Sequence, residues 1–476
     1  MNEKYLTKTI EELHDLLVQK VITPVDLVEE AFANIKENEA LNAFITLNDK
    51  ALDEAKALKE VEEDNLFWGL PIAIKDNIVT KDLRTTCASK MLENFIPIYD
   101  ATVVEKIKQK HMIIIGKTNM DEFAMGSTSR TSYFGAPHNP RDISKIAGGS
   151  SGGSAACVAA NLVPFALGTD TGGSIRQPAS YTGIVGMKPT YGSISRYGLV
   201  AFASSLDQIG PMTTNVKDNA LLLNMLVGHD ERDLTSSTRE KEDFTRKIGT
   251  SIKGMKIAIP NYFMSDIVTD EIRKAIEEIV VFLQQQGASV EQVDMRYLEN
   301  AVTLYQIIAM GEASSNLARF DGVRYGFRCD EPKNVEDMYT RTRQLGFGDE
   351  VKRRIMVGSY LLSGKNATEY YNKALSIRDD MKKEFDRIFK DYDLIIGPTT
   401  TTVAYGLDES LDDPNKAFMD DVLVIPVNMA GLPGMSIPIA MNKDGLPIGL
   451  HIIGNAFDEA TMYQLASYIE EGYHGI

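Results

Sequence analysis

The sequence predicts an α/β protein. Its 476 residues are 43% hydrophobic and 25% charged, which is the composition of a globular chain with a substantial core. Short apolar runs typical of buried strands alternate with amphipathic helical patterns along most of the chain. No linker, repeat or low-complexity run interrupts this alternation, so we expect one domain spanning residues 1–476.

The first 65 residues are expected to form a helical layer. Thr9 and Glu12 have the spacing of a capping box ahead of an apolar helical face. Thr23 followed by Pro24 is typical of the start of a second helix. A charged helix should follow over residues 51–63.

Residues 66–230 are expected to hold the core of the fold. An apolar strand should end at Lys75, and the pattern then predicts a helix over 102–110, a strand over 112–115 and a helix over 119–124. Residues 148–177 contain two Gly/Ser clusters, separated by one small-residue helix and one short apolar strand. An amphipathic helix is predicted over 215–227.

The remaining elements follow the same alternation. We expect a strand at 255–259, a helix over 270–286 that Gly287 ends, and a strand at 288–293. Residues 298–392 are charged and mainly helical, which indicates a cap or insertion over the sheet. Residues 393–476 should return to the sheet, with strands in 393–399, 434–440 and 445–454 and a last helix from about 458.

Charge and cysteine content narrow the function classes. The chain has 50 basic and 67 acidic residues, a net charge of −17, which argues against binding a nucleic-acid backbone unaided. Cys87, Cys157 and Cys329 lack C-x-x-C spacing, so we expect neither a metal site nor a disulfide framework, and a reducing cytoplasm fits. No apolar run is long enough for a membrane span, and the N-terminus lacks a signal-peptide pattern.

The two Gly/Ser clusters suit a serine nucleophile with an oxyanion hole, because glycine lets the backbone bend and approach a substrate closely. Gly149 to Gly153 also matches the G-x-S-x-G nucleophile elbow, which would require an acid and a histidine. His229, His451 and His474 lie downstream, but none is in a small-residue turn. On this pattern alone a Ser-His-Asp hydrolase stays open.

A phosphate-loop interpretation of residues 116–118 is disfavoured. Gly116-Lys117-Thr118 resembles the end of a phosphate loop, but His111 occupies the position where that motif requires its first glycine.

Lys75 is the candidate base for such a serine. A serine hydroxyl is a weak nucleophile until a neighbour accepts its proton, and a neutral lysine can do so. Burial at the end of an apolar strand would have to lower the lysine pKa by roughly 3 from about 10.4, at a cost of about 4 kcal/mol. The alternative is that Lys75 pairs with Asp76 at the strand end and has no chemical role.

Lys75, the G-G-S-S-G-G-S run with Ser150 and the D-T-G-G-S-I-R-Q-P run with Ser174 together resemble the amidase signature family. The resemblance implies a mixed sheet covered by helices on both faces, with residues 66–230 as the catalytic core. It also implies that Ser174 is the nucleophile, that Ser150 relays its proton from a cis peptide after Gly149, and that Lys75 is the base. The implied oxyanion hole consists of the N–H groups of Thr171, Gly172, Gly173 and Ser174.

Within that family, long runs such as S-R-Y-G-L-V-A-F-A-S-S-L-D-Q-I-G-P and G-F-G-D-E-V-K-R-R-I are similar to the glutaminase subunits of tRNA-dependent amidotransferases. This resemblance implies that the chain hydrolyses glutamine, binding it through Tyr305, Arg354 and Asp421. The chain would form a heterotrimer with subunits B and C, and the ammonia would pass to a partner subunit. ATP and Mg²⁺ would be used in a partner subunit, and the mischarged tRNA would be held mainly by one. That tRNA would be Glu-tRNA(Gln), Asp-tRNA(Asn) or both.

The sequence departs from the usual family pattern at Ser129-Arg130 and at residues 363–368, and these differences could alter partner contacts or a pocket wall. Two other functions are considered: a stand-alone amidase acting on small amides, and an inactive scaffold. The intact Lys75, Ser150 and Ser174 argue against the scaffold.

Overall fold

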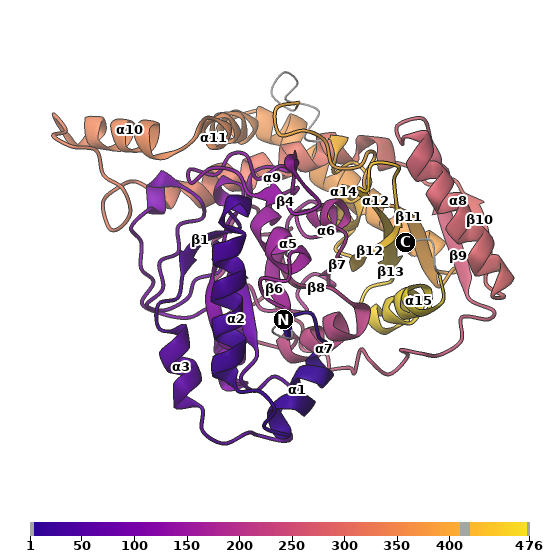
Figure 1. The fold of residues 1–476 in the computed structure, drawn as a ribbon. Coiled ribbons are helices and arrows are strands. Elements are labelled where there is room, and N and C mark those ends of the chain that lie inside the picture. Colours follow the sequence, from indigo (N-terminus) through magenta and orange to yellow (C-terminus); the bar gives the residue numbers. More distant parts are fainter. Residues whose placement is uncertain (1–3, 410–418, 474–476) are drawn as a thin grey trace.

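The fold is organised around one large sheet. The computed structural model describes residues 4–409 and 419–473. Eleven strands form the sheet in the order β1-β3-β2-β6-β8-β7-β12-β13-β11-β9-β10, and β4 pairs separately with β5 (Figure 1). The strands are β1 (Phe44–Leu47), β2 (Pro71–Lys75), β3 (Ile113–Thr118), β4 (His138–Asn139), β5 (Asp142–Ile146), β6 (Phe165–Asp170), β7 (Val185–Lys188), β8 (Gln208–Thr213), β9 (Lys256–Pro260), β10 (Ser289–Val293), β11 (Leu394–Pro398), β12 (Gly434–Met441) and β13 (Pro447–Gly454).

The sheet is mixed and is covered on both faces. β3, β2 and β6 are parallel, as are β11, β9 and β10, and the strands between these two groups pair antiparallel. Every residue of β2, β3, β6, β7, β8, β11 and β13 is buried. Because successive side chains of a strand point to opposite faces, complete burial requires a layer on each face. The α/β prediction with helices on both faces is confirmed.

Helices supply these layers. α5 packs on β2, β6 and β8, α6 on β7, β12 and β13, α2 on β2 and β3, and α15 on β12 and β13. The helices are α1 (Ile10–Val18), α2 (Pro24–Glu37), α3 (Ala51–Ala57), α4 (Thr102–Gln109), α5 (Gly152–Ala159), α6 (Arg176–Thr182), α7 (Val216–Leu226), α8 (Asp270–Gln285), α9 (Ala301–Asn316), α10 (Val335–Gly346), α11 (Asp349–Leu361), α12 (Asn372–Ile388), α14 (Ile425–Ala430) and α15 (Glu459–Gly472).

The segment predicted to be helical over 298–392 contains α9, α10, α11 and α12, which confirms its helical character. Figure 1 shows α10 and α11 along the upper side of the molecule, beyond the strands. α9 packs against α11, α12 and α14. These contacts join four helices into one cluster.

Several local expectations are confirmed. Thr9 and Thr23 each accept the N3 backbone N–H of their helix, with Glu12 and Asp26 completing the two capping boxes. The strand ending at Lys75 is β2, and Gly287, at a φ of 89°, follows α8. In the described ranges no helix has both the length and the apolar character to cross a membrane.

Other expectations are wrong. The predicted helix at 119–124 is only a 3-10 turn over Glu122–Ala124, because Phe123 has a left-handed φ of 50° that breaks a helix. The helix expected over 51–63 ends at Ala57, after which Leu58 is extended. The N-terminal layer also contains a strand, β1, which pairs antiparallel with β3. The sequence pattern does not anticipate the β4–β5 hairpin.

Candidate active site

Lys75 lies at the carboxyl end of β2, in the interior of the molecule. Its ammonium donates to Ser150 Oγ and Ser151 Oγ, each at 2.7 Å, and to the carbonyl of Thr169 at 3.3 Å. The side chain is completely buried. The alternative pairing with Asp76 is not formed, because Asp76 faces Lys117, whose Nζ lies 3.7 Å from Asp76 Oδ1.

Burial lowers the pKa of Lys75 from 10.5 to about 7, although the carboxylates of Asp121, Asp170 and Asp207 oppose the shift. Removing an ammonium from water disfavours its charged form, and the surrounding hydroxyls supply hydrogen bonds but no full charge. A large fraction of Lys75 is therefore neutral near pH 7, as a general base must be.

The first Gly/Ser cluster holds Ser150 against this lysine. The Gly149–Ser150 peptide bond is cis, as the family resemblance implies. Gln177 Oε1 accepts the Gly149 N–H at 2.9 Å, and Ser129 Oγ donates to the Gly148 carbonyl at 2.9 Å. These contacts hold the backbone at and just before the cis bond.

The second cluster reaches the same point through the backbone. The Ser151 N–H donates to the Ser174 carbonyl at 3.2 Å, so the two loops are joined directly behind their serines. Ser174 is 5% exposed, whereas Ser150 is completely buried. Ser174 is therefore slightly more accessible than Ser150, which lies against the interior lysine.

Asp170, the last residue of β6, anchors the turn that carries Ser174. It accepts the N–H groups of Gly173 at 2.8 Å and Ile175 at 3.1 Å, and it pairs with both Nε and Nη2 of Arg176 at 3.0 Å. Burial raises the pKa of Asp170, but the Arg176 charge and these hydrogen bonds offset this and hold the pKa well below its usual range. The turn is therefore clamped by a permanent carboxylate.

This clamp corrects one expectation. The Gly173 N–H donates to Asp170 Oδ1, so in this structure it is not available as a donor to an oxyanion. The candidate oxyanion donors that remain are the N–H groups of Thr171, Gly172 and Ser174. Gly173 has a different role: its φ of +120° is accessible to glycine and rarely to other residues, and this conformation makes the turn.

Two of the three residues expected to bind substrate lie against the same turn. A Cβ placed on Gly172 would come within 2.7 Å of the Tyr305 ring, and one on Gly173 would come within 2.8 Å of Asp421 Oδ1. Among the described residues, Asp421 Oδ1 has no hydrogen-bond partner although it is buried. Burial, with Asp420 and Asp170 nearby, raises the Asp421 pKa well above its ordinary value. A positively charged substrate group would fit this carboxyl.

Arg354, on α11, is the third. Its Nε donates to Glu350 Oε1 at 2.6 Å, and its guanidinium lies over the Phe202 ring at 5.5 Å from the centroid. Its side chain is nearly buried, and its charge influences the pKa of Tyr305, which burial raises above 10.0. A planar, fixed guanidinium beside Tyr305 suits a carboxylate.

Histidines do not complete a Ser-His-Asp site. His451 is buried and its Nε2 faces Arg176 Nη1 at 3.0 Å, while burial and the Arg176 charge lower its pKa well below 6.5. His229 contacts Ser236. His474 lies outside the described residues. Over the described ranges no three His, Cys, Asp or Glu side chains gather as a metal ion would need.

Sequence reasoning missed Ser151, the second hydroxyl on Lys75, and the polar clamp of Asp170, Arg176 and Asn428. Asn428 Nδ2 donates to Asp170 Oδ1 at 2.8 Å from α14, which is 258 residues away in the chain. A signal existed for Ser151, because it directly follows Ser150. None existed for Asn428.

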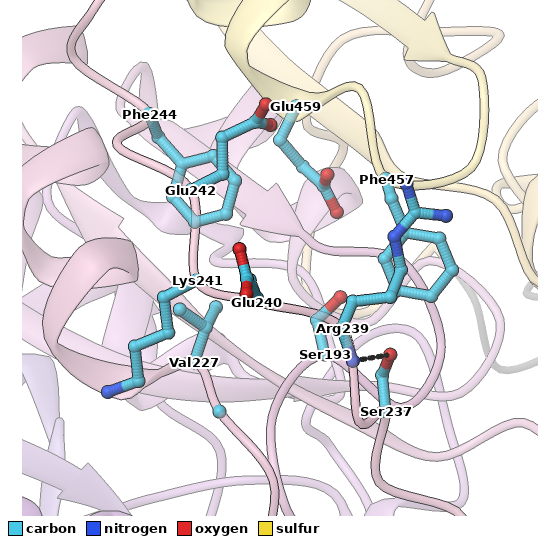
Figure 2. Close-up of a pocket in the computed structure, with 11 residues that line it drawn as sticks. Ser193, Val227, Ser237, Arg239, Glu240, Lys241, Glu242, Phe244, Phe457 and Glu459 are labelled. Carbon is cyan, nitrogen blue, oxygen red and sulfur yellow. Dashed lines mark hydrogen bonds between the residues drawn. The ribbon is translucent and has the colours of Figure 1, made fainter.

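A separate pocket of about 110 Å³ lies between residues 237–244 and the turn before α15 (Figure 2). Arg239 stacks on the Phe457 ring at 4.6 Å, and the buried Glu459 accepts the Thr190 N–H at 2.8 Å. None of the candidate catalytic residues lines this pocket, which therefore lies apart from the candidate active site.

Comparison with known proteins agrees with this geometry. The family model described as Amidase matches residues 26–463. The chain is 55% identical to the A subunit of Glutamyl-tRNA(Gln) amidotransferase of Pediococcus pentosaceus, over 98% of this chain and 97% of that protein. The crystal structure of the A subunit of Glutamyl-tRNA(Gln) amidotransferase from Thermotoga maritima superposes with a TM-score of 0.84 at 39% identity, covering 99% of this chain and 96% of that one. A peptide amidase from Stenotrophomonas maltophilia superposes with a TM-score of 0.83 at 26% identity, covering 98% and 97%.

The family model covers most of the chain, and the similarity to the curated relative runs nearly end to end. The fold is the one that the amidase resemblance implies. The chain belongs to the amidase family.

Proposed function

We propose that this chain is the glutaminase subunit of a tRNA-dependent amidotransferase. The observation that carries the proposal is the buried Lys75, with its pKa of about 7. Its Nζ donates to Ser150 Oγ, and the N–H of the next residue, Ser151, donates to the Ser174 carbonyl. The similarity to the amidotransferase protein of Pediococcus pentosaceus supports the choice of reaction.

In the proposed reaction, Ser174 Oγ attacks the side-chain amide carbon of glutamine while its proton passes through Ser150 to neutral Lys75. The developing oxyanion accepts N–H groups of Thr171, Gly172 and Ser174, and preorganised donors of this kind contribute several kcal/mol to lowering a barrier. Collapse breaks the C–N bond, and Lys75 returns the proton through Ser150 so that ammonia leaves. Water then hydrolyses the acyl-enzyme to glutamate and regenerates Ser174.

Recognition of glutamine follows from the charges around the turn. Arg354 is proposed to bind the α-carboxylate and Asp421 the α-ammonium group, with Tyr305 in the pocket. Pairing with an ammonium would favour the charged form of Asp421, whose Oδ1 is unpaired in the described structure.

The ammonia is proposed to reach a partner that amidates Glu-tRNA(Gln), and use of Asp-tRNA(Asn) would follow the same chemistry. Subunits B and C of a heterotrimer would supply the ATP and Mg²⁺ site and hold most of the tRNA, in the cytoplasm. The net charge of −17 supports tRNA binding elsewhere than on this chain. One domain over residues 1–476, with 298–392 as a cap, also belongs to this proposal.

A stand-alone amidase is the second candidate, because the peptide amidase has the same fold. The two functions differ in their need for Arg354 and Asp421. A free-standing amidase acting on small amides would not require an α-carboxylate and an α-ammonium group on its substrate.

The test is ammonia release from glutamine by the purified chain, with and without partner subunits and aminoacyl-tRNA, beside Ser174→Ala. Release that increases with the partners and disappears in Ser174→Ala supports the glutaminase. Hydrolysis of unrelated amides without partners, together with no activity on glutamine, would establish the stand-alone amidase.

A further inference from the structure

Asp207 is a buried carboxylate that the proposed mechanism does not use. It lies directly before β8, is 3% exposed, and forms no ion pair within the described ranges. Burial raises its pKa to about 6 despite its hydrogen bonds. A carboxylate without a basic partner in the interior is costly, so its contacts call for an explanation.

One set of contacts reaches the oxyanion turn. Asp207 Oδ1 accepts the Thr171 hydroxyl at 2.7 Å, and Thr171 is the first residue of the turn that ends at Ser174. Together with the Asp170 clamp at Gly173 and Ile175, this bond fixes the turn at both ends.

The other set of contacts reaches Phe202, whose ring forms the platform beneath Arg354. Asp207 Oδ2 accepts the Phe202 N–H at 2.9 Å, and Oδ1 accepts the Ala203 N–H at 3.2 Å. The Phe202 ring supports the Arg354 guanidinium, and the Phe202 carbonyl accepts Asn316 Nδ2 at 3.1 Å from the end of α9. α9 also carries Tyr305. Glu312 on the same helix accepts the Ser205 N–H at 2.9 Å, which secures the loop from outside.

We propose that Asp207 is a positioning residue that sets the distance between the oxyanion turn and the carboxylate-binding arginine. Its two oxygens bond to the two structures that must match the length of one substrate: the turn where the amide reacts and the platform of Arg354. A substrate amide held from its α-carboxylate reacts only if this spacing is correct, since small misplacements cost large factors in rate. The inference rests on the proposed glutaminase function.

The central experiment compares Asp207→Asn with wild type in the complex with the partner subunits. The amide keeps the shape but replaces one carboxylate oxygen by an NH2 group, so the backbone N–H of either Phe202 or Ala203 loses its acceptor. We expect kcat for glutamine to fall at least tenfold and KM to rise about threefold or more. Asp218→Asn is the matched control, because Asp218 is also buried, has a pKa raised to about 6, and accepts the Ile10 N–H away from the site. That variant should lose thermal stability with unchanged kcat and KM.

Three further variants test the two structures that Asp207 joins and do not depend on Asp207→Asn folding. Thr171→Val removes the hydroxyl and should lower kcat with little change in KM, while Thr171→Ser keeps the hydroxyl and should retain more of the activity. Phe202→Leu removes the arginine platform and should mainly raise KM.

The outcomes distinguish this inference from the function on which it rests. Wild type that releases no ammonia from glutamine with its partners overturns the proposed function. If wild type is active and Asp207→Asn has the same kcat and KM, the positioning role is overturned. It is also overturned if Thr171→Ser and Thr171→Val lose activity equally.

Discussion

The lowered pKa of Lys75 predicts the pH dependence of the reaction. A pKa of about 7 makes about half of the Lys75 side chains neutral at pH 7, against roughly one in 3,000 for a lysine of pKa 10.5. Burial therefore raises the amount of base at neutral pH by about three orders of magnitude. Since the proposed mechanism uses the neutral form of Lys75 as the base, kcat/KM for glutamine should increase about tenfold per pH unit below 7 and level off above it.

The assay is ammonia release at subsaturating glutamine between pH 5.5 and 9, with the partner subunits present. Lys188→Met is the control, because Lys188 is also buried with a pKa lowered to about 7, but it donates to the Pro189 carbonyl and contacts neither serine. Its midpoint should stay near 7, and Lys75→Met should be inactive at every pH. A flat profile from pH 6 to 9, or a midpoint near 10, would refute a neutral Lys75 as the base.

The same pKa has a consequence for stability. The folded protein binds fewer protons at Lys75 than the unfolded chain between about pH 7 and 10.5, so this group's contribution to the free energy of unfolding rises with pH in that window. In denaturant unfolding between these pH values, the free energy of unfolding of wild type should rise relative to that of Lys75→Met by up to about 1.4 kcal/mol per pH unit. A constant difference would contradict the lowered pKa.

Three other substitutions test the site. Arg354→Lys loses the planar pair of donors for a carboxylate, so KM for glutamine should rise about tenfold or more with a smaller effect on kcat, as steady-state kinetics would show; an unchanged KM would move the carboxylate site elsewhere. Gly173→Ala places a Cβ within 2.4 Å of Val424 at a φ of +120°, and should lower both activity and the unfolding midpoint, with about 1–3 kcal/mol lost. Arg176→Met leaves Asp170 charged and buried without its partner, and urea unfolding should show a loss of about 3–5 kcal/mol; a neutral result would mean that Asp170 is not ionised.

Local patterns predicted the parts of the fold that depend on neighbouring residues. The capping residues Thr9 and Thr23, the apolar strand before Lys75 and the glycine after α8 each act within a few positions of the element they define. The helix predicted at 119–124 is wrong for a local reason too: Phe123 takes a left-handed conformation, which helix propensity does not anticipate. The β4–β5 pair is too short to produce a periodic signal.

The site was predictable only in part. The spacing of Lys75, Ser150 and Ser174 carries a family pattern, and the Lys75–Ser150 contact is present in the structure. Tyr305, Arg354 and Asp421 have no local signal. Tyr305 and Asp421 lie against the turn because segments distant in the sequence meet there. The bonds of Asp207 to Thr171 and of Asn428 to Asp170 join residues 36 and 258 positions apart, which a single sequence does not reveal.

The strand order has a consequence for synthesis of the chain. β12 and β13, near the C-terminus, lie in the middle of the sheet between β7 and β11. Until they leave the ribosome, β7 and β11 each present an unpaired edge, and such edges favour aggregation. Pairing β7 with β12 also joins residues about 250 positions apart, which is slow because a long loop must close first. Nascent chains stalled before residue 434 should therefore depend on chaperones, and protease resistance should appear only after β13 has been made.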